Sequence, residues 1–287
     1  MKEKVIKYIL LVCALMSIIF LLGITITLFI EGLPIFSEVS PFEFIFGKSW
    51  HPTHSEPEFG ILPLIIGSIT VTLGAMIVAV PLGLGTAIYI SELSHSRMRE
   101  ILKPTVELLA SVPSVIYGFF GMVFLGPVSQ RIFDIPVGLN IFTASIILGI
   151  MALPTVASIS EDAISSIPRT LDEASYALGA TKWETITRAI IPASSSGIIA
   201  AVMLGLGRAV GETMTVLMVA GGAAQIPSSI FDPVRPMTAT IAAEMGESPI
   251  GSTHYHALFA IAIVLFLLTL GFNLLADWLA HRREVTF

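Results

Sequence analysis

Long uncharged stretches dominate the chain, and short segments between them carry most of its charge. A helix of about 20 apolar residues crosses roughly 30 Å of hydrocarbon, so each such stretch predicts a membrane-spanning helix. These stretches lie at residues 8–30, 59–91, 108–130, 135–160, about 197–220 and about 255–276. The pattern therefore predicts an all-α polytopic membrane protein with about six transmembrane helices.

Composition supports a bilayer as the solvent of this chain. Its 287 residues are 54% hydrophobic and only 13% charged, against roughly a quarter charged in soluble domains. The net charge of −6 gives no indication of nucleic-acid binding. Cys13 is the single cysteine, which excludes a disulfide within the chain. The first apolar stretch exceeds the roughly 7–15 residues of the hydrophobic region of a signal peptide, so we expect it to be retained.

Lysine and arginine are distributed unevenly between the two sides of the predicted helices. Cytoplasmic segments are enriched in these residues, which sets the orientation of the chain. With the N-terminus in the cytoplasm, only Lys48, Arg131 and Arg235 fall outside. The basic residues then placed inside are Lys2, Lys4, Lys7, Arg97, Arg99, Lys103, Arg169, Lys182, Arg188, Arg282 and Arg283. We therefore expect both termini to be cytoplasmic.

The connecting segments suggest how the chain is organised. Outer segments 31–58 and 221–253 are rich in proline and are expected to be irregular chain with short helices that cap the outer mouth. We expect residues 1–58 to form an N-terminal helix with an outer loop. Residues 59–287 would form a transmembrane core that carries a cytoplasmic loop at 161–192. The spans also contain helix-kinking prolines, which suit a moving pathway.

The cytoplasmic loop has the pattern of two short helices. Asp172 and its acidic neighbour would stabilise the positive start of the first helix, which Gly179 would end. Thr181 followed three residues later by Glu184 predicts a capping box for the second. Pro192 would end that second helix.

The second helix would present one apolar face. Trp183, Ile186 and Ile190 follow a spacing of three to four residues. We expect a helix-turn-helix with apolar residues to dock, although a surface helix that merely rests on the membrane would share this pattern.

A charged pair interrupts the fifth apolar stretch. Arg208 and Glu212 lie four residues apart, so on a continuous helix they would share one face and could pair. A central arginine costs roughly 3 kcal/mol on insertion scales and usually faces a bundle interior or a watery path. Its planar fork suits phosphate-like oxyanions. Glu212 could hold Arg208 extended and prevent over-tight binding; the alternative is a purely structural ion pair.

Other candidate sites are weaker. Gly47-Lys48-Ser49 resembles the end of a nucleotide-binding loop, but Phe42 stands where that loop requires glycine. We expect no metal and no cofactor. The paired histidines are expected to belong to polar loops, and the adjacent acids to mark the inner exit of the fourth span; these residues are His51, His54, His254, His256, Glu161 and Asp162.

The loop also resembles the coupling loop of ABC-transporter permeases. Glu173, Ala174, Gly179 and Pro192 match its spacing, whereas the departures from the pattern are Ser175, Ala189 and Ile191. In that family the loop sits in a groove of an ATPase subunit. The resemblance implies a coupling role for Asp172, Glu173, Ala174, Leu178, Gly179 and Trp183, and ATP hydrolysis by a partner rather than by this chain.

Residues 107–121 and 205–222 resemble the phosphate-specific transport (Pst) permeases, the second of them the C-type subunit. This resemblance implies a type I-like importer permease that moves inorganic phosphate across the cytoplasmic (inner) membrane of a prokaryote, with Arg208 and Glu212 in the substrate pathway. It implies as partners a homologous A-type permease, two ATP-binding ATPase subunits, an external phosphate-binding protein and membrane lipid.

Three alternatives stay open at this level. Sulfate and molybdate are tetrahedral oxyanions like phosphate. An ion-coupled secondary transporter could use Glu212 as a proton site, but it would be expected to show an internal repeat, which we do not find. A membrane-embedded enzyme or scaffold would lack any recognisable nucleophile–base or metal constellation in this sequence.

Overall fold

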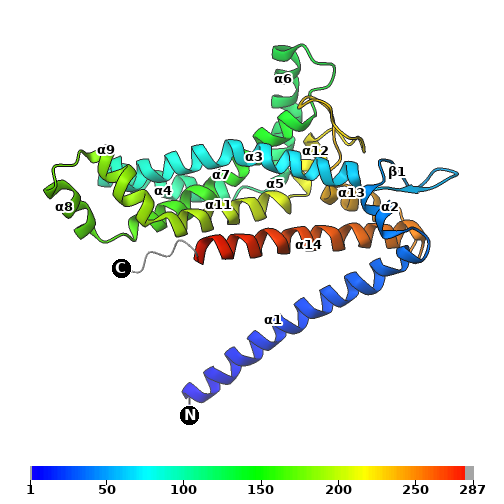
Figure 1. Ribbon diagram of the computed structural model, residues 1–287, viewed down its shortest axis with the longest axis horizontal. Helices are drawn as coiled ribbons and strands as arrows, with labels where there is room; N and C mark the ends of the chain where they lie inside the picture. The colour runs from blue at the N-terminus through cyan, green and yellow to red at the C-terminus, as the bar shows by residue number, and fades with distance from the viewer. Residues whose placement is uncertain (1, 282–287) are drawn as a thin grey trace.

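The computed structural model describes residues 2–281 and is mostly helical (Figure 1). Within this part of the chain, 5 helices are long and apolar enough to cross a membrane, and a bent helix pair can supply a sixth span. The predicted all-α polytopic fold is therefore confirmed. Arg282 and Arg283, which the orientation prediction places inside, lie outside the described residues.

Three of the five long spans are single helices, and two are composite segments that contain a π-helical turn. The five are α1 (Lys2–Gly32), α3 (Leu62–Ile88) with the π-helical turn η2 (Tyr89–Leu93), α5 (Ser114–Phe120) with η3 (Gly121–Leu125) and α6 (Gly126–Phe133), α7 (Ile141–Ser165) and α14 (Thr253–His281). The bent pair joins α9 (Lys182–Thr185), η4 (Ile186–Ile190) and α10 (Ile191–Ala193) to α11 (Ser195–Val210) at an angle of 71°.

Two predicted spans need correction. The third begins at Ser114 rather than residue 108, because helix α4 (Ser96–Ala110) ends first and Pro113 disfavours helix in the residue before it. The fifth is not continuous over 197–220: α11 ends before Gly211, and a separate helix α12 (Met214–Val219) follows.

Helices α3 and α7 lie side by side at the centre, and α11 packs against both. At Gly149 of α7, an added Cβ would lie 2.8 Å from the Cβ of Val78 and 2.9 Å from the carbonyl oxygen of Ala75. This close approach requires a residue without a side chain, as is typical of tightly packed membrane helices. The buried cluster around it contains Val71, Ala75, Leu148, Met151, Ala209, Val216 and Val219.

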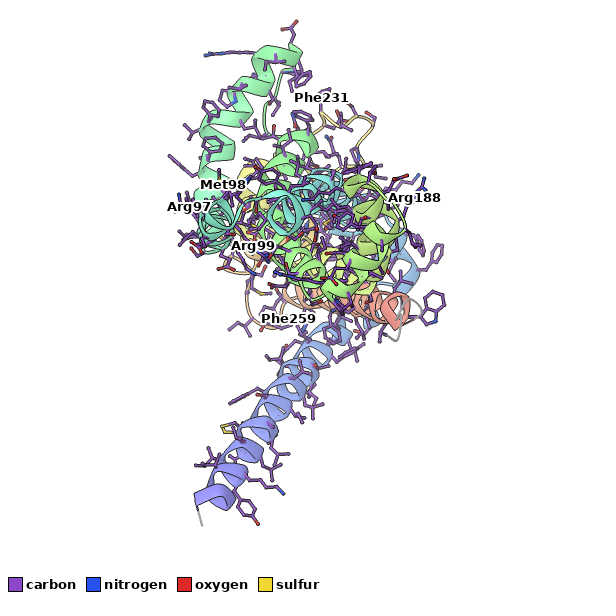
Figure 2. All side chains as sticks on the ribbon, turned by 90° about the vertical axis from the view of Figure 1, so that its left-hand side faces the viewer. Arg97, Met98, Arg99, Arg188, Phe231 and Phe259 are labelled. Carbon is purple, nitrogen blue, oxygen red and sulfur yellow. The ribbon has the colours of Figure 1, made fainter. Side chains whose placement is uncertain are left out.

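Helix α1 projects away from this bundle (Figures 1 and 2). It contacts α14 and the short helix η1 (Leu33–Ser37) near its outer end, where Gly32 approaches Ile263. Further along, apolar side chains have no cover from the chain itself; Leu15 is 50% exposed and Phe20 62%. This helix is therefore available to lipid or to a second subunit.

The outer segments fold more regularly than predicted. Residues 31–58 form η1, α2 (Pro41–Phe46) and a hairpin of β1 (Trp50–His51) and β2 (Glu58–Phe59), whose strands pair Trp50 with Phe59. Segment 221–253 contains α13 (Met237–Glu244). The hairpin was not predicted; it packs into a buried cluster with the outer ends of α3 and α14 that includes Phe44, Trp50, Leu64 and Leu258.

Candidate functional site

Two interrupted helices meet inside the bundle. The break between α4 and α5 lies against the break between α11 and α12. Thr215 Oγ1 donates to the carbonyl of Ser114 at 2.9 Å, and Arg208 Nη2 donates to the carbonyl of Ala110 at 3.3 Å. Both carbonyls lie beside the break between α4 and α5, and each accepts from a side chain of α11 or α12. Irregular backbone within a membrane requires such partners.

Arg208 is held between two helices at this crossing. Its Nη1 donates to Thr155 Oγ1 of α7 at 3.0 Å, and its Nη2 contacts the end of α4. The hydroxyl of Tyr117 lies nearby and donates to the carbonyl of Leu109 at 2.9 Å. Arg208, Thr155 and Tyr117 are all half-buried. A guanidinium carries five N–H donors, so Arg208 keeps donors for a further acceptor such as an anion.

The predicted pairing of Arg208 with Glu212 on one helix face is wrong. Helix α11 is capped at Gly211, so the 3.6-residue period does not extend to Glu212. Instead Glu212 Oε1 accepts from the backbone N–H of Thr215 at 3.1 Å, and its carbonyl accepts from Thr238 Oγ1 at 2.8 Å. Within the described residues no ion pair joins the two side chains. Gly211 is only a weak local signal of this break, because glycine is common at helix ends but also occurs inside membrane helices.

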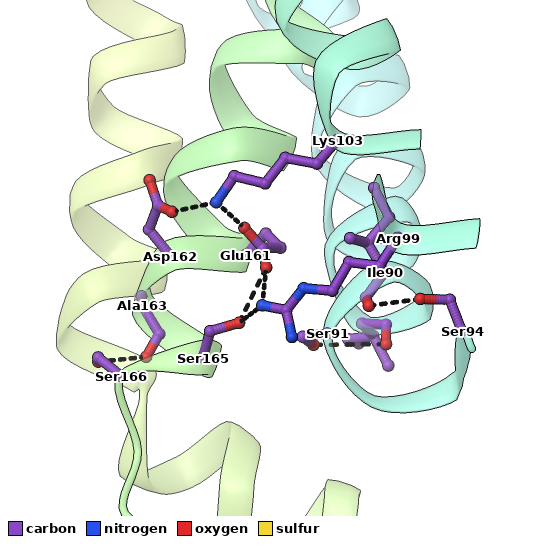
Figure 3. A network of polar contacts seen from close by, with 11 residues as sticks. Ile90, Ser91, Ser94, Arg99, Lys103, Glu161, Asp162, Ala163, Ser165 and Ser166 are labelled. Carbon is purple, nitrogen blue, oxygen red and sulfur yellow. Dashed lines mark hydrogen bonds and ion pairs between the residues drawn. The ribbon is translucent and has the colours of Figure 1, made fainter. Parts of the chain in front are cut away.

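A cluster of ion pairs joins α4 to the C-terminal end of α7 (Figure 3). The side chain of Glu161 is only 1% exposed and accepts from Lys103 Nζ at 2.6 Å and from Arg99 Nη2 at 2.5 Å. Asp162 also accepts from Lys103, at 2.7 Å. A carboxylate buried this deeply needs such partners, because its desolvation is otherwise costly.

Sequence reasoning placed Glu161 and Asp162 at the inner exit of the fourth span without assigning them partners. The helix ends one turn later, at Ser165. The hydrogen bond from Lys103 to Asp162, followed by that to Glu161, raises the pKa of the Lys103 ammonium. The available signal was the four-residue spacing of Arg99 and Lys103, which places both cations on one face of α4.

The loop predicted to be cytoplasmic forms the expected helix-turn-helix, which we call the elbow (residues 169–193). Helix α8 (Arg169–Ala177) is followed by Gly179 at a φ of 85°, which favours glycine. Thr181 and Glu184 form the predicted capping box at the start of α9. Pro192 lies in the last turn before the bend into α11, close to where the second helix was expected to end.

The apolar side chains of the elbow form two groups. One group is buried at its base, where it meets the bundle, and the other is exposed at its tip, around the turn between α8 and α9. Ile186 and Ile190 are 1% and 2% exposed and pack against the ends of α3 and α7. Trp183 does not join them: it is 64% exposed, and Leu178 in the turn is 90% exposed. The expected coupling residues lie along this tip: Asp172, Glu173 and Ala174 in α8, Leu178 and Gly179 in the turn, and Trp183 in α9.

The outer segments are tied together around Glu244. Its carboxylate accepts from Arg235 Nη1 and from Trp50 Nε1, and it lies 2.9 Å from His254 Nε2. His256 Nδ1 lies 2.7 Å from the carbonyl of Glu31. These contacts make the two histidines part of the loop anchoring. The other two, His51 and His54, stack on each other.

A multi-span helical bundle with an arginine held at two helix breaks, and with an apolar elbow exposed at one end, has the architecture of a membrane transport permease. The chain belongs to the family of binding-protein-dependent transport system inner membrane components, whose model matches residues 79–285. It is therefore a multi-pass inner-membrane permease of the ABC importer type. This assignment decides against the ion-coupled secondary transporter considered from the sequence.

Relatives are similar over nearly the whole chain. A probable ABC transporter permease protein, YqgH of Bacillus subtilis, is 40% identical over 95% of this chain and 89% of its own. The phosphate transport system permease protein PstC of Mesorhizobium japonicum is 35% identical over 94% of this chain and 88% of its own. PstC of Pasteurella multocida is 33% identical over 79% and 76%.

Solved structures of importers share the fold. A chain of a bacterial alginate ABC transporter, in complex with an alginate-bound periplasmic protein, aligns with a TM-score of 0.68 at 18% identity, covering 96% of this chain and 94% of that one. A chain of the inward-facing MetNI methionine transporter aligns with a TM-score of 0.58 at 19% identity, covering 79% and 95%. Both confirm a permease fold of the type I-like class.

Proposed function

We propose that this permease carries inorganic phosphate through a pathway beside the crossing of the two helix breaks, with Arg208 as its anion contact. The observation that carries the proposal is a half-buried guanidinium, fixed by Thr155 and Ala110, with donors to spare. A guanidinium can bind two oxygens of a phosphate through parallel charge-assisted hydrogen bonds. The relatives named as phosphate transport permeases support the same cargo.

The neighbouring residues suit a site that must also release its cargo. The Tyr117 hydroxyl can donate to an anion oxygen once it leaves the carbonyl of Leu109. The Thr155 hydroxyl accepts from Arg208 and can keep that contact while the anion binds. Glu212 lies in the adjacent break and caps the start of α12 rather than neutralising Arg208. Its negative charge close to the path weakens anion binding, as rapid release demands. We therefore keep both Arg208 and Glu212 in the proposed pathway.

The elbow is the proposed contact with an ATP-hydrolysing subunit. Leu178 and Trp183 expose apolar surface at its tip, while Ile186 and Ile190 fix its base to the bundle. Exposed aromatic and aliphatic side chains of this kind are typical anchors of protein interfaces. Closure of two such ATPases would move the elbows and alternate the access of the pathway. The chain itself would then hydrolyse no nucleotide.

The remaining partners follow from surfaces that the chain leaves open. The exposed length of α1 is suited to a second, homologous permease of the A-type, which would complete the pathway. An external phosphate-binding protein would dock on the outer segments, and both termini would be cytoplasmic. In this arrangement residues 1–58 form a peripheral helix and outer loop around the core at 59–287.

Uptake of radiolabelled phosphate by the reconstituted complex tests the proposal. Arg208→Gln should abolish uptake while leaving assembly and ATP binding intact, because glutamine lacks the charge and the fork. Arg131→Gln, at an exposed arginine of α6, is the matched control and should transport normally. Normal uptake by Arg208→Gln would refute the role of Arg208. Equal competition by sulfate would point to a general oxyanion permease instead.

A further inference from the structure

The end of α4 has an unusual arrangement of hydrogen-bond partners. The last carbonyls of a helix lack partners within it and carry its partial negative charge. Here Leu109 O accepts from the Tyr117 hydroxyl, and Ala110 O accepts from Arg208. Arg208 is thus the C-terminal cap of α4 as well as the proposed anion contact. It has free donors, but an anion that bound both Nη atoms in parallel would compete with Ala110 for Nη2.

The distances indicate which contact an incoming anion would replace. The bond from Arg208 to Ala110 is 3.3 Å long, against 3.0 Å to Thr155 Oγ1. Ala110 offers a neutral carbonyl, whereas hydrogen bonds to an ionised acceptor are shorter and roughly twice as strong. An anion would therefore displace Ala110 first, while Thr155 on α7 keeps the guanidinium in place.

The other end of α4 is fixed. Arg99 and Lys103 bind the buried Glu161 carboxylate near the C-terminal end of α7, and only a short segment separates that end from the elbow. Ionic contacts at one end and a replaceable bond from Arg208 at the other would let α4 pivot about the end that carries Arg99 and Lys103. Such a pivot would connect the pathway with the segment that leads to the elbow.

We propose that cargo releases the C-terminal end of α4 by taking Arg208 away from Ala110, and that Thr155 is a positioning residue that presents the guanidinium to the anion. This inference rests on the pathway role proposed above for Arg208. It adds that an anion in the site allows α4 to move. The movement of α4 would then transmit the occupancy of the site toward the elbow.

Hydrogen exchange in the assembled complex tests the release step. The amides of Ser111 and Val112 bond to Leu108 O and Leu109 O in the last turn of α4. In nanodiscs without nucleotide, inorganic phosphate should speed their exchange relative to chloride at equal ionic strength. Arg208→Gln should show fast exchange with or without phosphate. Unchanged or slower exchange in the wild type with phosphate would overturn the release step.

Uptake kinetics test Thr155. Thr155→Val should raise the KM for phosphate about three- to tenfold, the effect of one net hydrogen bond, with the maximal rate within about twofold. Thr155→Ser should restore the KM. Thr70→Val is the matched control, because the Thr70 hydroxyl bonds only to its own helix, and it should leave both constants unchanged. A loss of maximal rate alone in Thr155→Val, or failure of serine to restore the KM, would overturn the positioning role.

The two proposals fail separately. If Arg208→Gln transports phosphate normally, the pathway role falls and the release step falls with it. If Arg208→Gln abolishes uptake but phosphate leaves the exchange of the α4 end unchanged, the pathway role stands and only the release step is refuted.

Discussion

Removal of the Glu161 carboxylate tests whether the ionic cluster fastens α4 to α7. The side chain is 1% exposed and accepts from both Arg99 and Lys103. Hydrogen bonds to charged groups contribute roughly 1.5–3 kcal/mol each. The two cations are 40% and 34% exposed and can regain water, so solvent screening reduces the sum. For Glu161→Ala we expect a net loss of about 2–3 kcal/mol.

Thermal unfolding of the purified complex measures this loss. A destabilisation of 2–3 kcal/mol corresponds to a Tm lower by roughly 5 °C for a chain of this size. Asp162→Ala is the matched control, because Asp162 is 63% exposed and shares only Lys103. It should cost less than about 1 kcal/mol. A Tm of Glu161→Ala close to that of the wild type, or equal losses in both variants, would refute the reasoning.

Three further predictions address the elbow, the outer loop and the core. Leu178→Ser combined with Trp183→Ala should greatly reduce co-purification of an ATPase without lowering the Tm, and retention of the ATPase would contradict the docking role. Hydrogen bonds from the backbone N–H and hydroxyl of Ser228 and from the backbone N–H of Ser229 lower the pKa of Asp232. The loop should therefore have its full stability above about pH 3.8 and lose it as the pH falls through the lower pKa of the folded state, which hydrogen exchange can follow. Asp232→Asn should remove that pH dependence. Gly149→Leu should force α3 and α7 apart and abolish assembled complex on gel filtration, whereas normal assembly would show that the contact can yield.

Features set by local chemistry could be predicted from the sequence. The span at Ile141–Ser165 follows from the length of an uncharged stretch, which differs from the structure only at its ends. The capping box of Thr181 and Glu184 depends on residues three positions apart, so its pattern contains all the information needed. Partners distant in the chain could not be read in this way, as the pairing of Glu161 with Arg99 shows.

The hairpin of Trp50 and Phe59 was missed for a related reason. Each strand is only two residues long, too short for alternation to be visible. Their stability comes from burial against the ends of α3 and α14 and from the bond of Trp50 to Glu244. The bond from Trp50 to Glu244 joins residues 194 positions apart, so no local pattern encodes it.

The charged residues of the fifth stretch show why the fine structure of the site escaped prediction. Counting four positions from Arg208 to Glu212 assumes an unbroken helix, and hydropathy gives no reason to doubt it. A break inside a membrane is costly unless other groups bind the freed backbone. Those groups are Thr238, which binds Glu212 O, and Thr215, which binds the carbonyl of Ser114. The break at Gly211 is stable because a second break lies against it, so it could not be located from its own sequence alone.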